Sequence, residues 1–166
     1  MHRVLRANLK GNTILKILET SLELEQVTPI LNVRSVPQSL AWFERLGWHR
    51  SFTWNEDGMI EDMADRDKYG EADYGGVISG SVQIFLCLDA QGARNATNEM
   101  DEFDQTVGVW MTWWLRTQLE VVELYARVCQ LDYRIVMPLR IQPWNAVEFR
   151  IRHPDGHTFR VSALLD

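Results

Sequence analysis

Two segments in the second half of the chain carry tryptophan or charged residues at an even spacing. Trp110 and Trp114 lie four residues apart, and Glu148, Arg150 and Arg152 occupy every second position. Successive side chains of a β-strand point to opposite faces, so each set would share one face. Indole rings offer stacking surface to aromatic compounds and attract cations. A carboxylate beside arginines either forms a structural ion-pair ladder or orients a polar group of a ligand. This pattern indicates recognition of a small molecule.

Groups that usually carry covalent chemistry are scattered along the sequence. Cys87 and Cys129 lie far apart and are interpreted as free thiols without an adjacent base. His153 and His157 flank a Pro-Asp-Gly turn, where a surface or turn-bonding histidine is more typical than a metal ligand. There is no Gly-rich phosphate loop. We therefore expect no catalytic residues.

Hydrophobic periodicity divides the chain into two similar halves, each a strand, a helix and three further strands. Ser35 would cap the first helix, Pro37 would open it and Gly47 would end it. The repeated β-α-β-β-β units predict an α+β fold in which curved sheets surround a cleft and helices cover the outside. The expected strands span 28–33, 48–54, 74–79, 81–89, 107–115, 134–139, 146–152 and 158–164, and the second helix spans 118–131.

Residues 1–26 are interpreted as an N-terminal extension that is helical or partly disordered, and residues 27–166 as one domain. The extension does not resemble a signal peptide, because its short apolar block is interrupted by Lys16. No apolar run approaches the roughly 20 residues that span a membrane. With two separated cysteines, these features favour the cytoplasm and no membrane partner.

The net charge of −6 is unevenly distributed. Acidic residues gather in 55–73 and 90–106, and the remainder of the chain is slightly basic. A nucleic-acid partner is not expected, because phosphates require a basic face. The acidic segments either attract a cationic ligand over long range or simply maintain solubility.

Two motifs point to a known superfamily. The run 28–48, TPILNVRSVPQSLAWFERLGW, and the run 143–157, PWNAVEFRIRHPDGH, stand at opposite ends of the duplicated region. They resemble the opening strand–helix and the closing hairpin of the vicinal-oxygen-chelate superfamily, which includes glyoxalases, bleomycin-resistance proteins and extradiol dioxygenases. The resemblance covers about residues 27–164. It implies paired β-α-β-β-β modules, clefts between curved sheets and, often, a homodimer.

The resemblance also implies where a catalytic metal would be held. The positions that carry ligands in metalloenzymes of the superfamily match Thr28, Trp110 and Arg160, with Gln83 as a further candidate. Tryptophan cannot ligate a metal, and arginine carries a fixed positive charge. We therefore expect no metal and no cofactor, and the chain is similar in type to the metal-free bleomycin-resistance-like proteins.

The cleft would instead be an aromatic pocket with a few polar groups. Trp42 and Trp113 are expected in the core, while Trp110 and Trp114 either line the pocket or fill the core. The expected ligand-binding residues are Asn32, Phe52, Trp54, Phe85, Trp110, Thr112, Trp114, Trp144, Glu148 and Arg160.

Three functions are compatible with these observations. The leading hypothesis is a metal-free protein that sequesters a planar aromatic compound, cationic ones included, as bleomycin-resistance proteins do. The second is a glyoxalase- or dioxygenase-type lyase or oxidoreductase with an atypical metal site. The third is an accessory protein whose residues 1–26 dock onto a partner.

Overall fold

A computed structural model describes residues 24–55, 58–59, 72–90 and 108–165. The predicted α+β fold is confirmed, with strand ends that differ from the prediction by a few residues and one additional short strand, β3. The first half contains β1 (Ile30–Val33), α2 (Val36–Arg45), β2 (His49–Asn55), β3 (Gly58–Met59), β4 (Tyr74–Ser79) and β5 (Val82–Leu88). The second contains β6 (Trp110–Trp114), α4 (Gln118–Gln130), β7 (Ile135–Gln142), β8 (Ala146–Arg152) and β9 (Thr158–Leu164). Most of the predicted N-terminal extension lies outside the described residues.

The strands form two sheets of the same topology. Sheet A has the order β1-β5-β4-β2-β3 and sheet B the order β6-β9-β8-β7. In each sheet the first strand of the module pairs in parallel with the last, and the other pairings are antiparallel. The structural duplication predicted from the sequence is therefore present in the backbone.

Local sequence signals account for the helix ends. The hydroxyl of Ser35 accepts the N–H of Gln38 at the start of α2, and the backbone at Gly47 adopts φ +99°, beyond the helix end. At the start of α4, Thr117 and Glu120 form a reciprocal capping box. Both helices thus begin at side-chain caps that the sequence provides, and α2 ends at a glycine.

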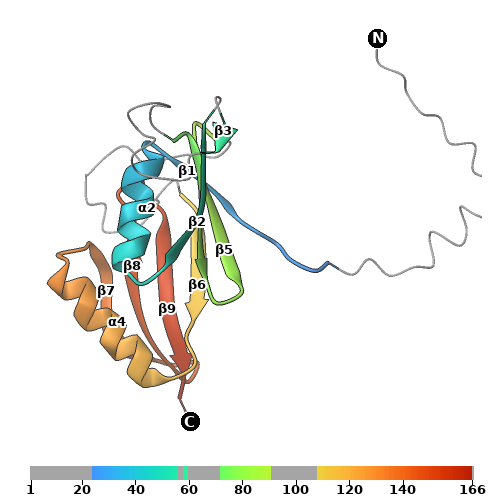
Figure 1. The fold of residues 1–166 in the computed structure, drawn as a ribbon. Coiled ribbons are helices and arrows are strands. Elements are labelled where there is room, and N and C mark those ends of the chain that lie inside the picture. The colour runs from blue at the N-terminus through green and yellow to red at the C-terminus, as the bar shows by residue number, and fades with distance from the viewer. Residues whose placement is uncertain (1–23, 56–57, 60–71, 91–107, 166) are drawn as a thin grey trace, which may run out of the picture.

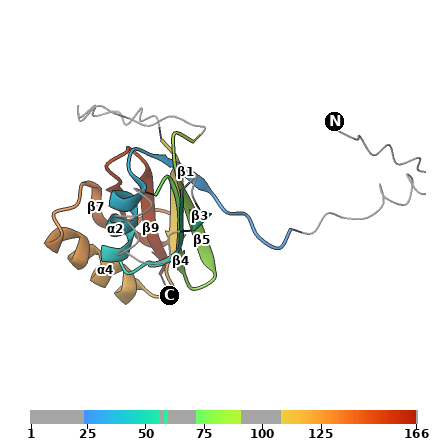
Figure 2. The same cartoon turned by 45° about the horizontal axis from the view of Figure 1, so that its top comes forward.

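One aromatic core joins the two modules. Helices α2 and α4 lie on the same side of the sheets (Figures 1 and 2). Trp42 and Phe43 of α2 contact Phe159 of β9, and Phe43 also contacts Trp113 of β6. Trp113 stacks on Phe159 with ring centroids 4.5 Å apart. Trp42 and Trp113 are buried as predicted, so the helix-facing sides of both sheets share a single packed interior.

Within the described residues, no helix combines the length and apolar character needed to cross a membrane.

Candidate ligand-binding site

The face of sheet B that points away from the helices carries most of the predicted site. Strand register places its side chains in rows: Trp110 beside Thr158, Thr112 beside Arg160, and Trp114 beside Ser162. On β8, Arg150 lies opposite Arg160 and Glu148 opposite Ser162. We call this surface the open face; it consists of Trp110, Thr112, Trp114, Glu148, Arg150, Thr158, Arg160 and Ser162, with Trp144 at its rim in the β7–β8 turn.

Three indoles of the open face are exposed to solvent. Trp114 is 59% exposed, Trp144 48% and Trp110 43%, whereas Trp113, which directly precedes Trp114, is buried. The alternation of β6 separates core from surface as the sequence predicts. A concentration of exposed large aromatic side chains on one face marks a binding surface.

A single buried carboxylate organises the polar centre of the face. Glu148 is fully buried. Its Oε1 accepts from Nε of Arg150 at 3.0 Å and from Nε of Arg160 at 3.2 Å. Its Oε2 accepts from Nη2 of Arg160 at 2.7 Å and from the hydroxyl of Ser162 at 3.1 Å. Four donors satisfy the acceptor capacity of this carboxylate. The sequence left open whether Glu148 forms an ion-pair ladder or orients a ligand, and in the structure Glu148 pairs with both Arg150 and Arg160.

This arrangement keeps Glu148 ionised. Burial, the largest influence, raises its pKa, but hydrogen bonds from Arg160, Arg150 and Ser162 outweigh burial and hold the pKa below its usual value. Arg150 and Arg160 are direct cross-strand neighbours, and like charges in such positions repel each other. The carboxylate between them neutralises part of that repulsion.

Each arginine also lies over an indole. The guanidinium carbon of Arg150 is 5.4 Å from the centroid of the Trp110 ring, and that of Arg160 is 5.4 Å from the Trp144 ring. These distances are within the range of cation–π attraction. Trp110 and Trp144 are therefore positioned by the same two arginines that form ion pairs with Glu148.

Sheet A presents a second, uncharged aromatic surface. Phe52, Tyr74 and Phe85 form a triad with centroid separations of 5.2–5.7 Å, and Trp54 is exposed on the same strand as Phe52. The ring of Phe52 lies against Gly76, where an added Cβ would come within 2.5 Å of it. Burial raises the pKa of Tyr74. Phe52 and Phe85, both predicted site residues, thus contact one another.

Asn32 departs from its predicted role as an open hydrogen-bonding group. It is only 7% exposed, and its Nδ2 donates to the backbone carbonyl of Ala90 at 2.6 Å. The backbone carbonyl oxygen of Asn32 accepts a hydrogen bond from Nε2 of His157 at 2.8 Å. Asn32 is engaged within the protein.

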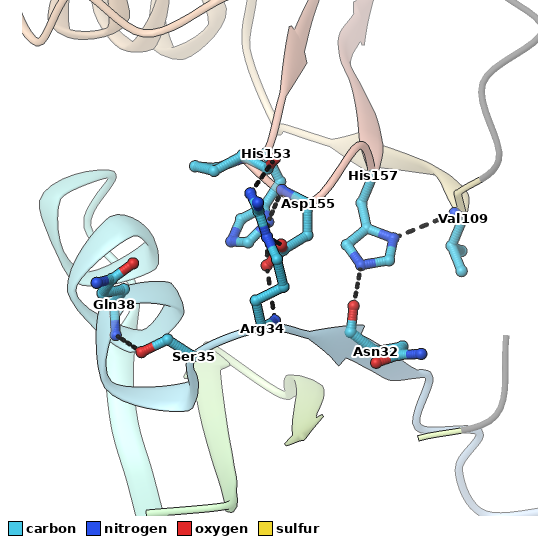
Figure 3. A network of polar contacts seen from close by, with 9 residues as sticks. Asn32, Arg34, Ser35, Gln38, Val109, His153, Asp155 and His157 are labelled. Carbon is cyan, nitrogen blue, oxygen red and sulfur yellow. Dashed lines mark hydrogen bonds and ion pairs between the residues drawn. The ribbon is translucent and has the colours of Figure 1, made fainter. Parts of the chain in front are cut away.

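The hairpin between β8 and β9 attaches sheet B to the first module through a polar network (Figure 3). The N–H of Val109 donates to Nδ1 of His157, so the proton of this ring is on Nε2, which donates to Asn32. Arg34, beyond β1, forms an ion pair with Asp155 of the hairpin. We call His153, Asp155, His157 and their contacts the hairpin clasp.

The histidines of the clasp are buried and neutral, so the prediction of a surface role was wrong. The turn-bonding alternative is correct for His153, whose Nδ1 accepts the N–H of Asp155, whereas the ring of His157 bonds to Asn32 and Val109 outside the turn. Burial lowers the pKa of His153 to about 3, against the opposing influence of Asp155 and with help from His157 and Arg34. Burial likewise lowers the pKa of His157. The N–H of Asp155 donates to Nδ1 of His153 at 3.1 Å, so this contact is a hydrogen bond to a neutral ring and the ion pair of Asp155 is with Arg34.

A separate pocket of about 600 Å³ adjoins the clasp. Its lining includes Arg34, Trp42, Arg45, Tyr133 and His153. The pocket lies beside α2, whereas the open face is on the side of sheet B that points away from the helices.

The residues at the metal-ligand positions do not fit a divalent ion. Arg160 is committed to Glu148, Trp110 offers an indole, and the side chains of Thr28 and Gln83 both accept hydrogen bonds from Gln26. A guanidinium would repel a cation, and an indole has no lone pair to donate to one. Across 24–55, 58–59, 72–90 and 108–165, no three His, Cys, Asp or Glu side chains gather as a metal site would require.

Comparison with solved structures supports the fold. TioX from Micromonospora sp. ML1 is similar with a TM-score of 0.62 at 15% identity, over 85% of this chain and 99% of that one. The bleomycin resistance determinant encoded on the transposon Tn5 has a TM-score of 0.54 at 17% identity, over 85% and 98% of the two chains. Lactoylglutathione lyase from Agrobacterium tumefaciens has a TM-score of 0.56 at 12% identity, over 84% and 94%.

A comparison with curated proteins found no match. The family profile described as Glyoxalase/Bleomycin resistance protein/Dioxygenase superfamily matches residues 23–161, which include both motifs and every strand from β1 to the middle of β9. This chain belongs to the glyoxalase/bleomycin resistance protein/dioxygenase superfamily.

Proposed function

We propose that this protein binds a planar aromatic small molecule on the open face of sheet B, without a metal. The observation that carries the proposal is the exposure of Trp110, Trp114 and Trp144 around one ordered ion-pair cluster. Stacking of a flat ligand would remove apolar indole surface from water. Because Arg150 and Arg160 already hold two of these rings, little side-chain freedom would be lost on binding.

The superfamily contains proteins with the corresponding role. One structural neighbour is a bleomycin resistance determinant, and we propose that this chain likewise sequesters its ligand, with antibiotics that contain planar rings among the candidates. We further propose that it acts in the cytoplasm as a homodimer. Measurement of its mass in solution by light scattering tests the dimer.

Titration of tryptophan fluorescence tests ligand binding. Bleomycin and a panel of planar heteroaromatic compounds should include members that quench the emission saturably. Trp114→Ala should weaken the binding of such a compound about tenfold or more, the loss expected for a stacking partner. Leu119→Ala is the matched control, because Leu119 is an exposed apolar side chain on α4. The proposal is wrong if no compound in the panel saturates, or if both variants lose affinity equally.

Metal analysis tests the metal-free part of the proposal. Protein purified without chelators should contain far less than one zinc, nickel, iron or manganese per chain. A stoichiometric transition metal would favour the alternative of a glyoxalase- or dioxygenase-type enzyme.

A further inference from the structure

The open face carries a positive centre. Arg150 and Arg160 share the single carboxylate of Glu148, which leaves one positive charge in excess. Arg140 of β7 lies directly opposite Glu148 and adds a further cation at the edge. The acidic segments of the sequence, 55–73 and 90–106, fall almost entirely outside the described residues. Strands β6 to β9 carry Arg140, Arg150, Arg152 and Arg160 against the single acid Glu148, so the strands of this face are basic although the whole chain is acidic.

The arginines retain unused donors. Arg150 reaches Glu148 through Nε alone, so neither of its terminal nitrogens bonds to a described residue. Arg160 uses Nε and Nη2, and its Nη1 bonds to none of the residues that the structure describes. The side chains of Arg150 and Arg160 are 22% and 30% exposed, so solvent or a ligand can reach them. Guanidinium N–H groups match the geometry of carboxylate and phosphate oxygens.

The exposed indoles are less suited to a cationic ligand than to a neutral or anionic one. The attraction of Trp110 and Trp144 for positive charge is already used by Arg150 and Arg160 on one face of each ring. A cationic ligand would also approach a centre of like charge with no free carboxylate, because Glu148 is buried and accepts four hydrogen bonds.

We infer that the ligand of the open face is an aromatic anion, a planar ring system bearing a carboxylate or an equivalent oxyanion. The ring stacks on the exposed indoles, and the anionic group accepts hydrogen bonds from the unused nitrogens of Arg150 and Arg160. The hydroxyl of Thr112, beside Arg160 on the neighbouring strand, is placed to contribute a further hydrogen bond. This inference rests on the proposed function and specifies its ligand class.

Calorimetry with three congeners of one ring tests the inference. The probes are 2-naphthoate, 2-naphthamide and 2-naphthylmethylammonium, which differ in charge but share the stacking surface. The carboxylate should bind at least about tenfold more tightly than the amide, a ratio within the strength of one charge-assisted hydrogen bond. The ammonium compound should bind most weakly, and added salt should weaken only the carboxylate.

A variant separates charge from stacking. Arg150→Gln should lower the affinity for 2-naphthoate about tenfold more than the affinity for 2-naphthamide, because both compounds lose the support of Trp110 but only the carboxylate loses a charged donor. Arg116→Gln, an exposed arginine between β6 and α4, is the charge-matched control and should change neither. Unfolding curves verify that both variants fold.

The outcomes distinguish the inference from the proposed function. If the amide or the ammonium compound binds as tightly as the carboxylate, the anionic ligand class is wrong while aromatic binding stands. If Arg150→Gln lowers all three affinities equally, the arginine serves packing and not charge recognition. If none of the three compounds and none of the fluorescence panel bind, both proposals fail.

Discussion

The imidazole of His157 donates to the backbone carbonyl of Asn32 at 2.8 Å and accepts the N–H of Val109 at 3.2 Å. Asn32 belongs to β1 of the first module and Val109 directly precedes β6 of the second. A fully buried ring in the closing hairpin therefore joins the starts of both modules. Both ring nitrogens are used in the neutral tautomer, so this junction requires an uncharged histidine.

Replacement of His157 should weaken the junction. His157→Ala leaves the buried carbonyl of Asn32 without its donor, and we expect the free energy of unfolding to fall by about 2–4 kcal/mol. Urea denaturation measures the change. His49→Ala, at an exposed position in β2, should change stability by less than about 0.5 kcal/mol. Equal losses in the two variants would contradict the role assigned to His157.

Acidification should destabilise the fold before most carboxylates titrate. His153 and His157 have pKa values below the ordinary 6.5 in the folded state, that of His153 at about 3. Below about pH 6.5 the unfolded chain takes up protons that the folded chain does not, so stability falls with pH by up to about 1.4 kcal/mol per pH unit for each histidine. For His153 this decline continues toward pH 3.

Denaturation curves between pH 7.5 and 5 check this dependence. The slope of unfolding free energy against pH should be reduced in His153→Gln, which removes one titrating ring near Asp155 and Arg34. A slope that is flat in the parent protein, or unchanged in the variant, would show that the buried rings are protonated in the folded state.

Gly76 should be required for the aromatic triad of sheet A. In Gly76→Ala the new methyl group would lie within 2.5 Å of the Phe52 ring and of the Ser51 hydroxyl, and we expect a loss of about 1–3 kcal/mol. Combining it with Phe52→Ala should cost less than the sum of the two single changes, because the methyl group then has space. Strict additivity would indicate that Phe52 does not lie over Gly76. Ser79→Ala, at an exposed position in the same strand, is the control.

Glu148→Gln should affect stability as well as ligand binding. The amide cannot neutralise Arg150 and Arg160, and we expect a loss of about 2–3 kcal/mol above pH 5, where the wild-type carboxylate is ionised. The difference from the parent should shrink as pH falls toward the lowered pKa of Glu148. Glu123→Gln, at an exposed position of α4, should change stability by less than about 0.5 kcal/mol at pH 7. A variant Glu148→Gln as stable as the parent would show that the arginines do not depend on the carboxylate.

Strand alternation predicted which residues of β6, β8 and β9 share a face, but it left open whether Trp110 and Trp114 line a pocket or fill the core. The period of two in β6 and β9 separates Trp110, Thr112 and Trp114 from buried Trp113, and places Arg160 beside Thr112. Ion pairing of Glu148 was one of two alternatives that its position beside Arg150 offered, and the structure shows that pairing. The ligand-binding role of these residues stays a prediction.

The hairpin clasp was beyond local sequence reasoning. The pairs of residues that it joins, Asn32 with His157 and Arg34 with Asp155, are separated by more than a hundred positions. Neither periodicity nor turn chemistry specifies such pairs, because they depend on how the two modules dock. The Pro-Asp-Gly turn flanked by histidines was the only local signal for this network. Its role could not be deduced locally, because the side chains of the turn bond to residues of the first module. The burial of Asn32 has the same origin, since contacts of its amide with Ala90 and of its carbonyl with His157 are both long-range.

Glu148 concentrates control of the open face in one position. It orients two guanidinium groups, and each of these lies over a different tryptophan. A single replacement there should therefore affect the positions of four neighbouring side chains together. Selectivity among relatives that share this cluster would consequently change in discrete jumps when position 148 varies, and drift gradually only when the surrounding rim varies.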